Sequence, residues 1–293
     1  FDRIDACYAR AIFAKNNNLE FIIPSNKNGI SLKKVAHPAL KEAKLLDIEF
    51  EKKVLMITGV NAGGKTMLLK TVLSAVLLSK HLIPFRVDAS NSHIGQFKNI
   101  EAIIDDPQNV KNDISTFAGR MVGFSKFFGL DSAIIGVDEI ELGTDSDEAA
   151  SLFKVIIENL IKKDIRIIIT THHKRLAALL ASNRSVELLA AQYDMERQQP
   201  TFGFLKGTIG KSYAFETAKR YGIPKNIIEE AIILHGKDKG RLNDLIEKSA
   251  SLELDLQSKR EELESELIKI KNIKESILES KQKEEESYKK IKY

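Results

Sequence analysis

The chain has 293 residues, and 43% of them are hydrophobic, which is enough to bury one large core with length to spare. The net charge of +4 permits a nucleic-acid partner without requiring one, because a solvated, mildly basic surface has the same balance. The single cysteine, Cys7, excludes an internal disulfide and suits a reducing cytosol, so a cytoplasmic location is expected. No apolar run approaches the length of a membrane span, so no membrane partner is expected.

The N-terminal stretch has the pattern of a helix. Apolar residues recur at helical spacing from Phe1 to about Asn18, where three consecutive asparagines end the run. Because the helical pattern is already under way at Phe1, we expect a fragment of a longer protein. Short β-like runs follow at Leu19–Pro24 and Leu45–Phe50, on either side of a loop that holds His37.

A glycine-rich segment lies between a predicted strand, Val54–Ile57, and a predicted helix from Met67 to about Leu78. The segment reads Gly59, Val60, Asn61, Ala62, Gly63, Gly64, Lys65 and Thr66. In this context its backbone N–H groups can turn onto phosphate oxygens, Lys65 can reach the β and γ phosphates, and Thr66 can ligate Mg²⁺. The pattern predicts a phosphate-binding P-loop, and a glycine-rich turn without a ligand is the alternative.

A second candidate site is the start of a helix predicted to run to about Phe128. It follows a polar turn, Asp105–Asn109, and begins near Ser115 and Thr116. A hydroxyl residue at this position is first of all a helix N-cap. The same helix start, with free N–H groups and a hydroxyl, is also an anion site, so both interpretations stay open.

Two adjacent carboxylates follow the apolar run Ala133–Val137, which is typical of a strand buried on both faces of a parallel sheet. Asp138 and Glu139 at the end of such a strand favour a positively charged ligand, because buried charges need a partner. In a P-loop protein the first carboxylate holds Mg²⁺ through its water shell. The second, Glu139, can polarise the water that attacks the γ phosphate.

The next predicted strand, Ile165–Ile169, follows a turn at Gly143–Asp145 and an amphipathic helix at Glu148–Ile161. It ends in two threonines and two histidines. A histidine in a loop is commonly a surface residue. Because the carboxyl ends of neighbouring strands are where open α/β sheets bind ligands, His172 is a candidate for the site.

The C-terminal part begins with two alternating runs, Val186–Ala191 and Thr201–Lys206, which predict antiparallel strands. A helix is predicted from about Gly210 to Tyr221, and a second begins at Lys225.

From about Arg241 the pattern becomes a heptad repeat. Its apolar a and d positions are Leu242, Leu245, Leu252, Leu256, Leu263, Ile270, Ile273 and Ile277. The rest of this segment is rich in charge, which predicts a solvated coiled coil or a long hairpin arm. A single exposed helix is the alternative, although isolated helices gain little stability without an apolar partner.

With these motifs in place, the chain resembles the ATPase domain of the MutS family, in particular the second bacterial branch of endonuclease-type relatives that suppress recombination. Five motifs in order carry the resemblance over about Leu45–Ala231. They are the P-loop with Asn61-Ala62-Gly63-Gly64 inside it, Ser115-Thr116-Phe117, Asp138-Glu139 with Gly143-Thr144-Asp145, Thr170-Thr171-His172, and Lys211-Ser212-Tyr213 ahead of Gly222-Ile223-Pro224.

Three departures from the family pattern matter. Val60 stands where the family usually has proline, which should change the stiffness of the loop more than its ligation. Glu141 stands where a glycine is common, so the loop after the two carboxylates is expected to differ. The branch also carries a small C-terminal nuclease domain, and because nothing like it precedes Tyr293, strand scission is not expected of this chain.

The resemblance implies an α/β P-loop NTPase fold of the ABC-ATPase type, with a helical N-terminal lead-in and a C-terminal coiled-coil or helical arm. The expected parts are the end of a lever helix at 1–18, the ATPase domain at 19–224 and the arm at 225–293. It implies ATP and Mg²⁺ as cofactors in composite sites of a homodimer. Lys65, Thr66 and Asp138 would hold MgATP, Glu139 would orient water, His172 would sense the γ phosphate, and Ser115 with Thr116 would contact the opposing subunit's nucleotide.

The resemblance further implies a DNA-binding ATPase that acts on branched DNA and suppresses recombination, with stalled or collided ribosomes as an alternative cargo. An SMC-like ATPase is disfavoured because the interval from Thr66 to Asp138 is too short for a long arm. A transporter subunit is disfavoured because the expected glycine-rich signature before Asp138 is absent. A non-hydrolysing nucleic-acid-binding module, with the nucleotide as a structural ligand, stays open.

Overall fold

The computed structural model describes residues 2–40, 43–59, 63–104, 116–141, 146–194, 199–210, 215, 218–219, 221–235 and scattered residues between 258 and 274. The chain forms two compact units, Phe1–Lys239 and Gly240–Tyr293. Several predicted features lie outside the described residues. These are Val60, Asn61 and Ala62 of the P-loop, the turn Asp105–Asn109, Ser115, the turn Gly143–Asp145, Lys211–Tyr213 and most of the arm.

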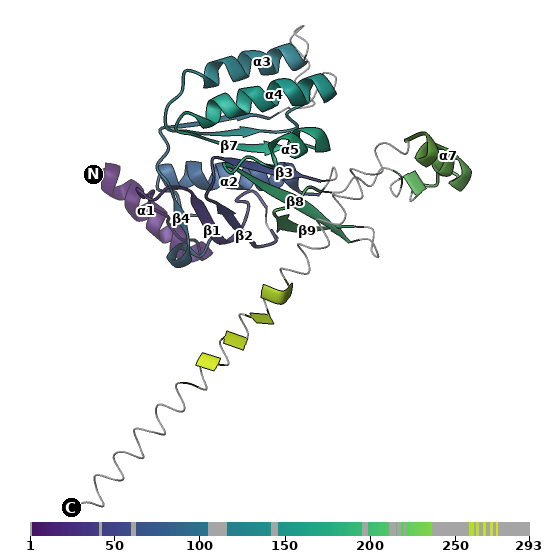
Figure 1. Ribbon diagram of the computed structural model, residues 1–293. Coiled ribbons are helices and arrows are strands. Elements are labelled where there is room, and N and C mark those ends of the chain that lie inside the picture. The colour runs from purple at the N-terminus through teal and green to yellow at the C-terminus, as the bar shows by residue number, and fades with distance from the viewer. Residues whose placement is uncertain are drawn as a thin grey trace, which may run out of the picture. The chain divides into compact units, whose positions relative to one another are not determined.

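A six-stranded sheet forms the centre of the first unit (Figure 1), with the strand order β5-β6-β7-β3-β8-β9. Its strands are β3 (Val54–Thr58), β5 (Asn99–Ile103), β6 (Ala133–Val137), β7 (Ile165–Thr170), β8 (Val186–Asp194) and β9 (Gln199–Lys206). The strands from β5 to β8 in this order are parallel, and β9 pairs with β8 in the antiparallel direction. The turns that follow β6, β7 and β3 therefore lie next to one another at one edge of the sheet.

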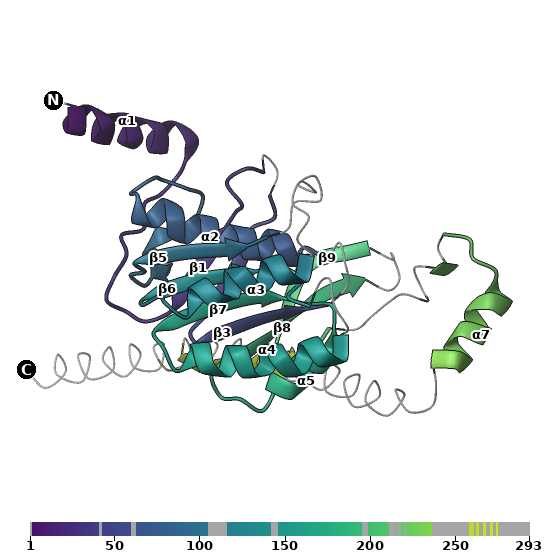
Figure 2. The ribbon, with the colours of Figure 1, turned by 90° about the horizontal axis from the view of Figure 1, so that it is seen from above.

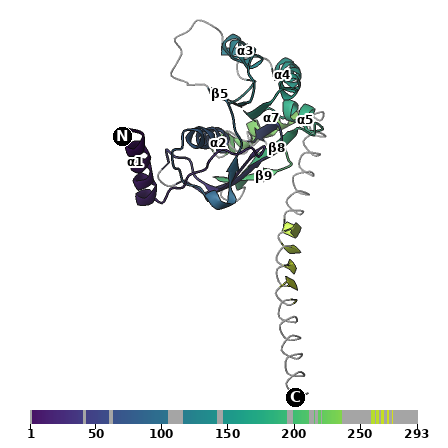
Figure 3. The same ribbon diagram turned by 90° about the vertical axis from the view of Figure 1, so that its left-hand side faces the viewer.

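Helices cover both faces of this sheet, as Figures 1 and 3 show. On one face lie α3 (Thr116–Phe127), α4 (Ser146–Ile161) and α5 (Lys174–Leu180), which cross in front of the strands in Figure 2. On the other face lies α2 (Lys65–Lys80). A small antiparallel sheet on the α2 side has the order β2-β1-β4. It consists of β1 (Ile30–Val35), β2 (Leu46–Phe50) and β4 (His93–Ile94), with the short helix η1 (Ala89–Asn91) before β4.

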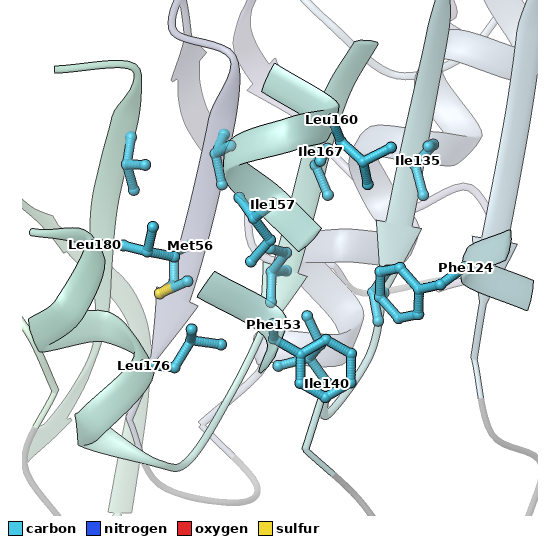
Figure 4. Packing of buried hydrophobic residues seen from close by; sticks show 14 of the residues in the cluster. Met56, Phe124, Ile135, Ile140, Phe153, Ile157, Leu160, Ile167, Leu176 and Leu180 are labelled. Atoms are coloured by element: carbon cyan, nitrogen blue, oxygen red, sulfur yellow. The ribbon is translucent and has the colours of Figure 1, made fainter. Parts of the chain in front are cut away.

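The central strands fill two separate cores with alternate side chains. Met56 of β3 belongs to the cluster beneath α3, α4 and α5, whereas its neighbours Leu55 and Ile57 belong to the cluster beneath α2. Figure 4 shows the first cluster, in which the rings of Phe124 and Phe153 lie 5.2 Å apart between centroids. Burial on both faces explains why β3 and β6 are nearly continuous apolar runs.

The segments between Leu19 and Val35 differ from the sequence-based expectation, and the strands β4 and β5 were not predicted. Leu19–Pro24 is not a strand, and its one pairing is an isolated bridge between Glu20 and Phe85. The strand in this region is β1, where the sequence indicated a loop; its two lysines interrupt the apolar pattern. The predicted antiparallel pair β8–β9 does form, but β8 also pairs in parallel with β3, so the hairpin extends the central sheet.

Helices also lie near both ends of the chain. In α1 (Asp2–Asn17), Nη1 of Arg10 donates a hydrogen bond of 2.9 Å to the carbonyl of His81. After Gly222 the helix α7 (Lys225–His235) begins. In the second unit, the described residues between 258 and 274 are helical. The assignment of α1 to a lever, the domain boundaries and the coiled coil stay predictions. Across the described parts of the chain, no helix is long and apolar enough to cross a membrane.

Candidate nucleotide-binding site

The glycine-rich segment follows β3 and leads directly into α2. Gly64 is the N-cap of α2 and has a φ of 86°, in the left-handed region that favours glycine. Lys65 is 5% exposed, and its Nζ donates a hydrogen bond of 2.8 Å to the carbonyl of Gly59. Burial lowers the pKa of Lys65, and the nearby carboxylates of Glu139 and Asp138 oppose that shift. A buried ammonium group at the start of a helix suits a phosphate ligand.

Thr66 and Asp138, the two residues predicted to hold Mg²⁺, lie within hydrogen-bonding distance of each other. Thr66 Oγ1 is 2.9 Å from Oδ1 and 3.0 Å from Oδ2 of Asp138. Mg²⁺ in nucleotide sites takes one or two protein oxygens together with phosphate and water oxygens. This pair of donors therefore fits a Mg²⁺ ion that accompanies a nucleotide.

Thr170, the last residue of β7, holds both carboxylate residues in place. Its hydroxyl donates a hydrogen bond of 2.5 Å to Oδ1 of Asp138 and accepts one of 2.8 Å from the backbone N–H of Glu139. Glu139 has a φ of 45°, an uncommon conformation for glutamate that needs support from its surroundings. From α3, the buried Arg120 donates a hydrogen bond of 2.8 Å to the carbonyl of Asp138. The turn after β6 is thus fastened to β7 and to α3.

The structure brings Lys65, Thr66, Asp138 and Glu139 together at the carboxyl edge of the sheet. His172 lies in the adjacent turn between β7 and α5, where it is exposed. Its ring contacts that of His173, with 4.0 Å between the centroids and a tilt of 40° between the ring planes. Thr116 is the first residue of α3.

A segment near the C-terminus of the domain packs against the P-loop. The N–H of Gly210 donates a hydrogen bond of 2.7 Å to Oγ1 of Thr58. A Cβ atom on Gly210 would lie 2.5 Å from Cα of Gly59, closer than real Cβ atoms approach. Only glycine therefore fits at position 210 without a shift of the P-loop.

An aromatic ring also lies beside the P-loop. A Cβ atom on Gly64 would be 3.2 Å from Cδ1 of Phe202 in β9. Phe202 is 49% exposed and has a φ of 53°. A partly exposed aromatic side chain therefore lies next to the glycine-rich loop.

Sequence reasoning missed Thr170, Arg120, Gly210 and Phe202 as parts of this site. Thr170 was noted only within a motif whose role was given to His172. A glycine next to Lys211 was a signal for close packing against another segment, although it did not identify the P-loop as that segment. Arg120 and Phe202 carry no local signal, because their contacts depend on how α3 and β9 pack.

Glu141, noted above as a departure, is fully buried at 1% exposure. Its two carboxylate oxygens lie 2.8 and 2.7 Å from Oγ1 of Thr171. Burial raises the pKa of Glu141 to about 7, against the lowering effects of the Thr171 hydrogen bond and the Arg120 charge. A carboxyl group that remains buried in this way needs its hydrogen-bond partner.

The strand–glycine loop–helix order, together with the Thr66–Asp138 pair on neighbouring elements, defines a P-loop nucleotide-binding protein. Residues 55–237 match the family model for MutS domain V. The chain therefore belongs to the MutS family, and this membership supports an ATPase domain with a mixed α/β fold and a mainly parallel sheet.

Curated relatives agree with this family. The chain is 55% identical over 289 residues to a protein named Endonuclease MutS2 from Helicobacter pylori, an alignment that covers 98% of this chain and 38% of that protein. It is 34% identical over 291 residues to Endonuclease MutS2 of Clostridium acetobutylicum, covering 97% of this chain and 36% of that protein. It is 31% identical over 260 residues to the Fusobacterium nucleatum protein of the same name, covering 86% of this chain and 33% of that protein. The chain thus spans less than two fifths of the length of these relatives.

Proposed function

We propose that this chain is an ATPase that binds MgATP at the carboxyl edge of its central sheet and hydrolyses it to ADP and phosphate. The observation that carries the proposal is the Thr66–Asp138 pair beside the buried Lys65, with Glu139 on the same turn as Asp138. Phosphoryl transfer depends mainly on positioned charge, and these groups supply it.

Each residue has a distinct part in this reaction. Lys65 and the backbone N–H groups at the start of α2 attract the β and γ phosphates. Thr66 and Asp138 would hold Mg²⁺, which would supply positive charge against that of the phosphates. Glu139 orients a water molecule and takes its proton as the water oxygen attacks the γ phosphorus. The bond from that phosphorus to the bridging oxygen breaks, and ADP leaves with the electron pair. His172, in the neighbouring turn, would sense the γ phosphate.

We further propose that each nucleotide is enclosed by two copies of the chain. Thr116, the first residue of α3, and Ser115, which precedes it in the sequence, would contact the nucleotide of the opposing subunit. Arg120 supports such coupling, because it ties α3 to the carbonyl of Asp138 within one subunit. A change at one nucleotide would then reach the helix that contacts the other.

The dimer proposal is tested by mixing subunits. Ser115→Ala and Lys65→Ala proteins should each be nearly inactive as homodimers. A mixed dimer regains one intact pocket, which combines Lys65 of one subunit with Ser115 of the other. Recovery of activity on mixing supports pockets shared between subunits, and a mixture no more active than its components contradicts them.

The proposed cargo is branched DNA, such as recombination intermediates, with the suppression of recombination as the outcome; the family match supports DNA binding in general. Residues 1–18 would be the end of a lever, 19–224 the ATPase domain and 225–293 an arm. Strand scission is not proposed for this chain.

The cargo proposal is tested by steady-state phosphate release with MgATP, alone and with a four-way DNA junction, linear duplex or purified ribosomes. Stimulation by the junction supports the DNA proposal, stimulation by ribosomes replaces it with ribosome splitting, and no release supports a non-hydrolysing module.

A further inference from the structure

The buried carboxyl group of Glu141 has no part in the mechanism above, although it lies only two residues after Glu139. At 1% exposure it is as buried as the core around it, and both of its oxygens face the hydroxyl of Thr171. Burial of a carboxyl group is unfavourable unless hydrogen bonds compensate for the lost water. An apolar side chain would fill this position at lower energetic cost, so a specific function for the carboxyl group is indicated.

Thr171 connects this carboxyl group to the turn that carries His172. The Thr171 hydroxyl accepts a hydrogen bond of 2.9 Å from the backbone N–H of His173. Its own proton is then available for Glu141, 2.7 to 2.8 Å away. The Thr171 backbone N–H donates to the carbonyl of Ile57, at 3.0 Å, which fixes this residue against β3. Glu141 therefore orients the side chain of Thr171, whose hydroxyl in turn binds the backbone of the His172–His173 turn.

The turn after β6 is also hydrogen-bonded to Thr170, the last residue of β7. The N–H of Ile140 donates to the carbonyl of Thr170 at 3.2 Å, and the N–H of Glu139 donates to the Thr170 hydroxyl at 2.8 Å. With the Glu141–Thr171 contact, the two turns are joined at three successive residues of the first turn. Glu139 and His172 thus stand on two loops that are held as one unit.

We propose that Glu141 is a positioning residue that locks the Glu139 turn to the His172 turn, so that the water-orienting and γ-phosphate-sensing groups keep a fixed relative position. This inference rests on the proposed ATP hydrolysis. Its specific consequence is that loss of the lock lowers the rate of the chemical step and leaves ATP binding by Lys65 and Thr66 almost unchanged, because neither residue belongs to the locked turns.

The experiment compares Glu141→Ala, Glu141→Gln and Thr171→Val with the wild type in steady-state ATPase assays. Glu141→Ala and Thr171→Val should each lower kcat at least tenfold with KM for ATP within about threefold. Glu141→Gln keeps an oxygen acceptor at the same place and should stay within about threefold of the wild-type kcat. The double variant Glu141→Ala with Thr171→Val should be no slower than the slower single variant, because both changes break one contact.

A matched control separates positioning from a general loss of stability. Ile157→Ala removes a fully buried side chain from α4 in the neighbouring core and should lower the melting temperature without a change in kcat of the folded protein. If Glu141→Ala fails to fold, the Thr171→Val variant carries the same test, since valine nearly preserves the volume of threonine.

The outcomes distinguish the two proposals. An active wild type with an unchanged kcat in Glu141→Ala or Thr171→Val overturns the positioning role alone. A Glu141→Gln variant as slow as Glu141→Ala also overturns it, because the hydrogen bond is retained there. An inactive wild type overturns the proposed ATPase function, and this inference with it.

Discussion

Thr66 at the start of α2 and Asp138 at the end of β6 are 72 residues apart in the sequence, yet the Thr66 hydroxyl lies 2.9 and 3.0 Å from the two carboxylate oxygens of Asp138. This pair joins the start of α2 to the turn after β6 that carries the two acidic residues. The Asp138→Asn variant keeps the shape of the side chain and removes its charge. We expect turnover to fall at least tenfold, with half-maximal activity shifted to a higher Mg²⁺ concentration. Turnover titrated against free Mg²⁺ tests this, and an unshifted Mg²⁺ curve would contradict the metal role.

Replacement of Glu139 by glutamine should separate binding from chemistry. Glutamine has the size of glutamate but cannot take a proton from water. ATP affinity should stay nearly intact while turnover falls at least tenfold, a barrier increase above about 1.4 kcal/mol. Equilibrium binding of a fluorescent ATP analogue and phosphate release, measured on the same preparation, give the two quantities. A Glu139→Gln protein with wild-type turnover would remove Glu139 from this role.

The exposed ring of Phe202 beside Gly64 is proposed to stack on the nucleotide base. Stacking of a base on an aromatic side chain is worth about 1–3 kcal/mol, so Phe202→Ala should weaken ATP binding at least fivefold. Because stacking on the base does not act on the γ phosphate, kcat should change little. Phe21→Ala is a matched control, since Phe21 is also partly exposed and belongs to no part of the site. Equal effects on binding from both variants would argue against stacking.

The stability of the protein should depend on pH through Glu141. Its pKa is raised to about 7 by burial, against a usual value of 4.5. Between these values the folded protein keeps a proton that the unfolded chain has released, so this group's contribution to the free energy of unfolding is lost as the pH rises. The Glu141→Gln variant lacks this proton. Its stability relative to the wild type should therefore increase by about 3 kcal/mol from pH 4.5 to 7. The free energy of unfolding of both proteins is measured by urea denaturation at a series of pH values. If the two free energies change with pH in the same way, the raised pKa of Glu141 is contradicted.

The parts of the fold that the sequence predicts best are the strands β3, β6 and β7. β3 and β6 are continuous apolar runs because they are buried on both faces, and β7 is apolar except for Arg166 and its terminal Thr170. Polar residues at the carboxyl end of each run mark the edge of the sheet. By contrast, β1 was not predicted, since Lys33 and Lys34 interrupt its apolar pattern. Local periodicity reports how a segment is buried, and a short strand at the side of the domain is buried on one face at most of its positions.

Only those residues of the candidate site that belong to a sequence motif could be predicted. The roles expected for Lys65, Thr66, Asp138 and Glu139 follow from their positions after predicted strands, and these residues do lie together. The contacts of Thr170 and Glu141 depend on β6 and β7 being neighbours, which the linear sequence does not state. Gly210 approaches the P-loop through its hydrogen bond to Thr58, which lies 152 positions earlier in the sequence, and no local signal identifies that partner. Such long-range contacts require the fold itself.

The central claim, that two copies of this chain together hydrolyse MgATP, is tested most directly by phosphate release at saturating MgATP over a range of protein concentrations, with Lys65→Ala as the background. The account predicts release well above that background and a rate per chain that rises with protein concentration until dimers form completely. Release no faster than in Lys65→Ala, or a full rate per chain at concentrations where the protein is a monomer, would contradict it.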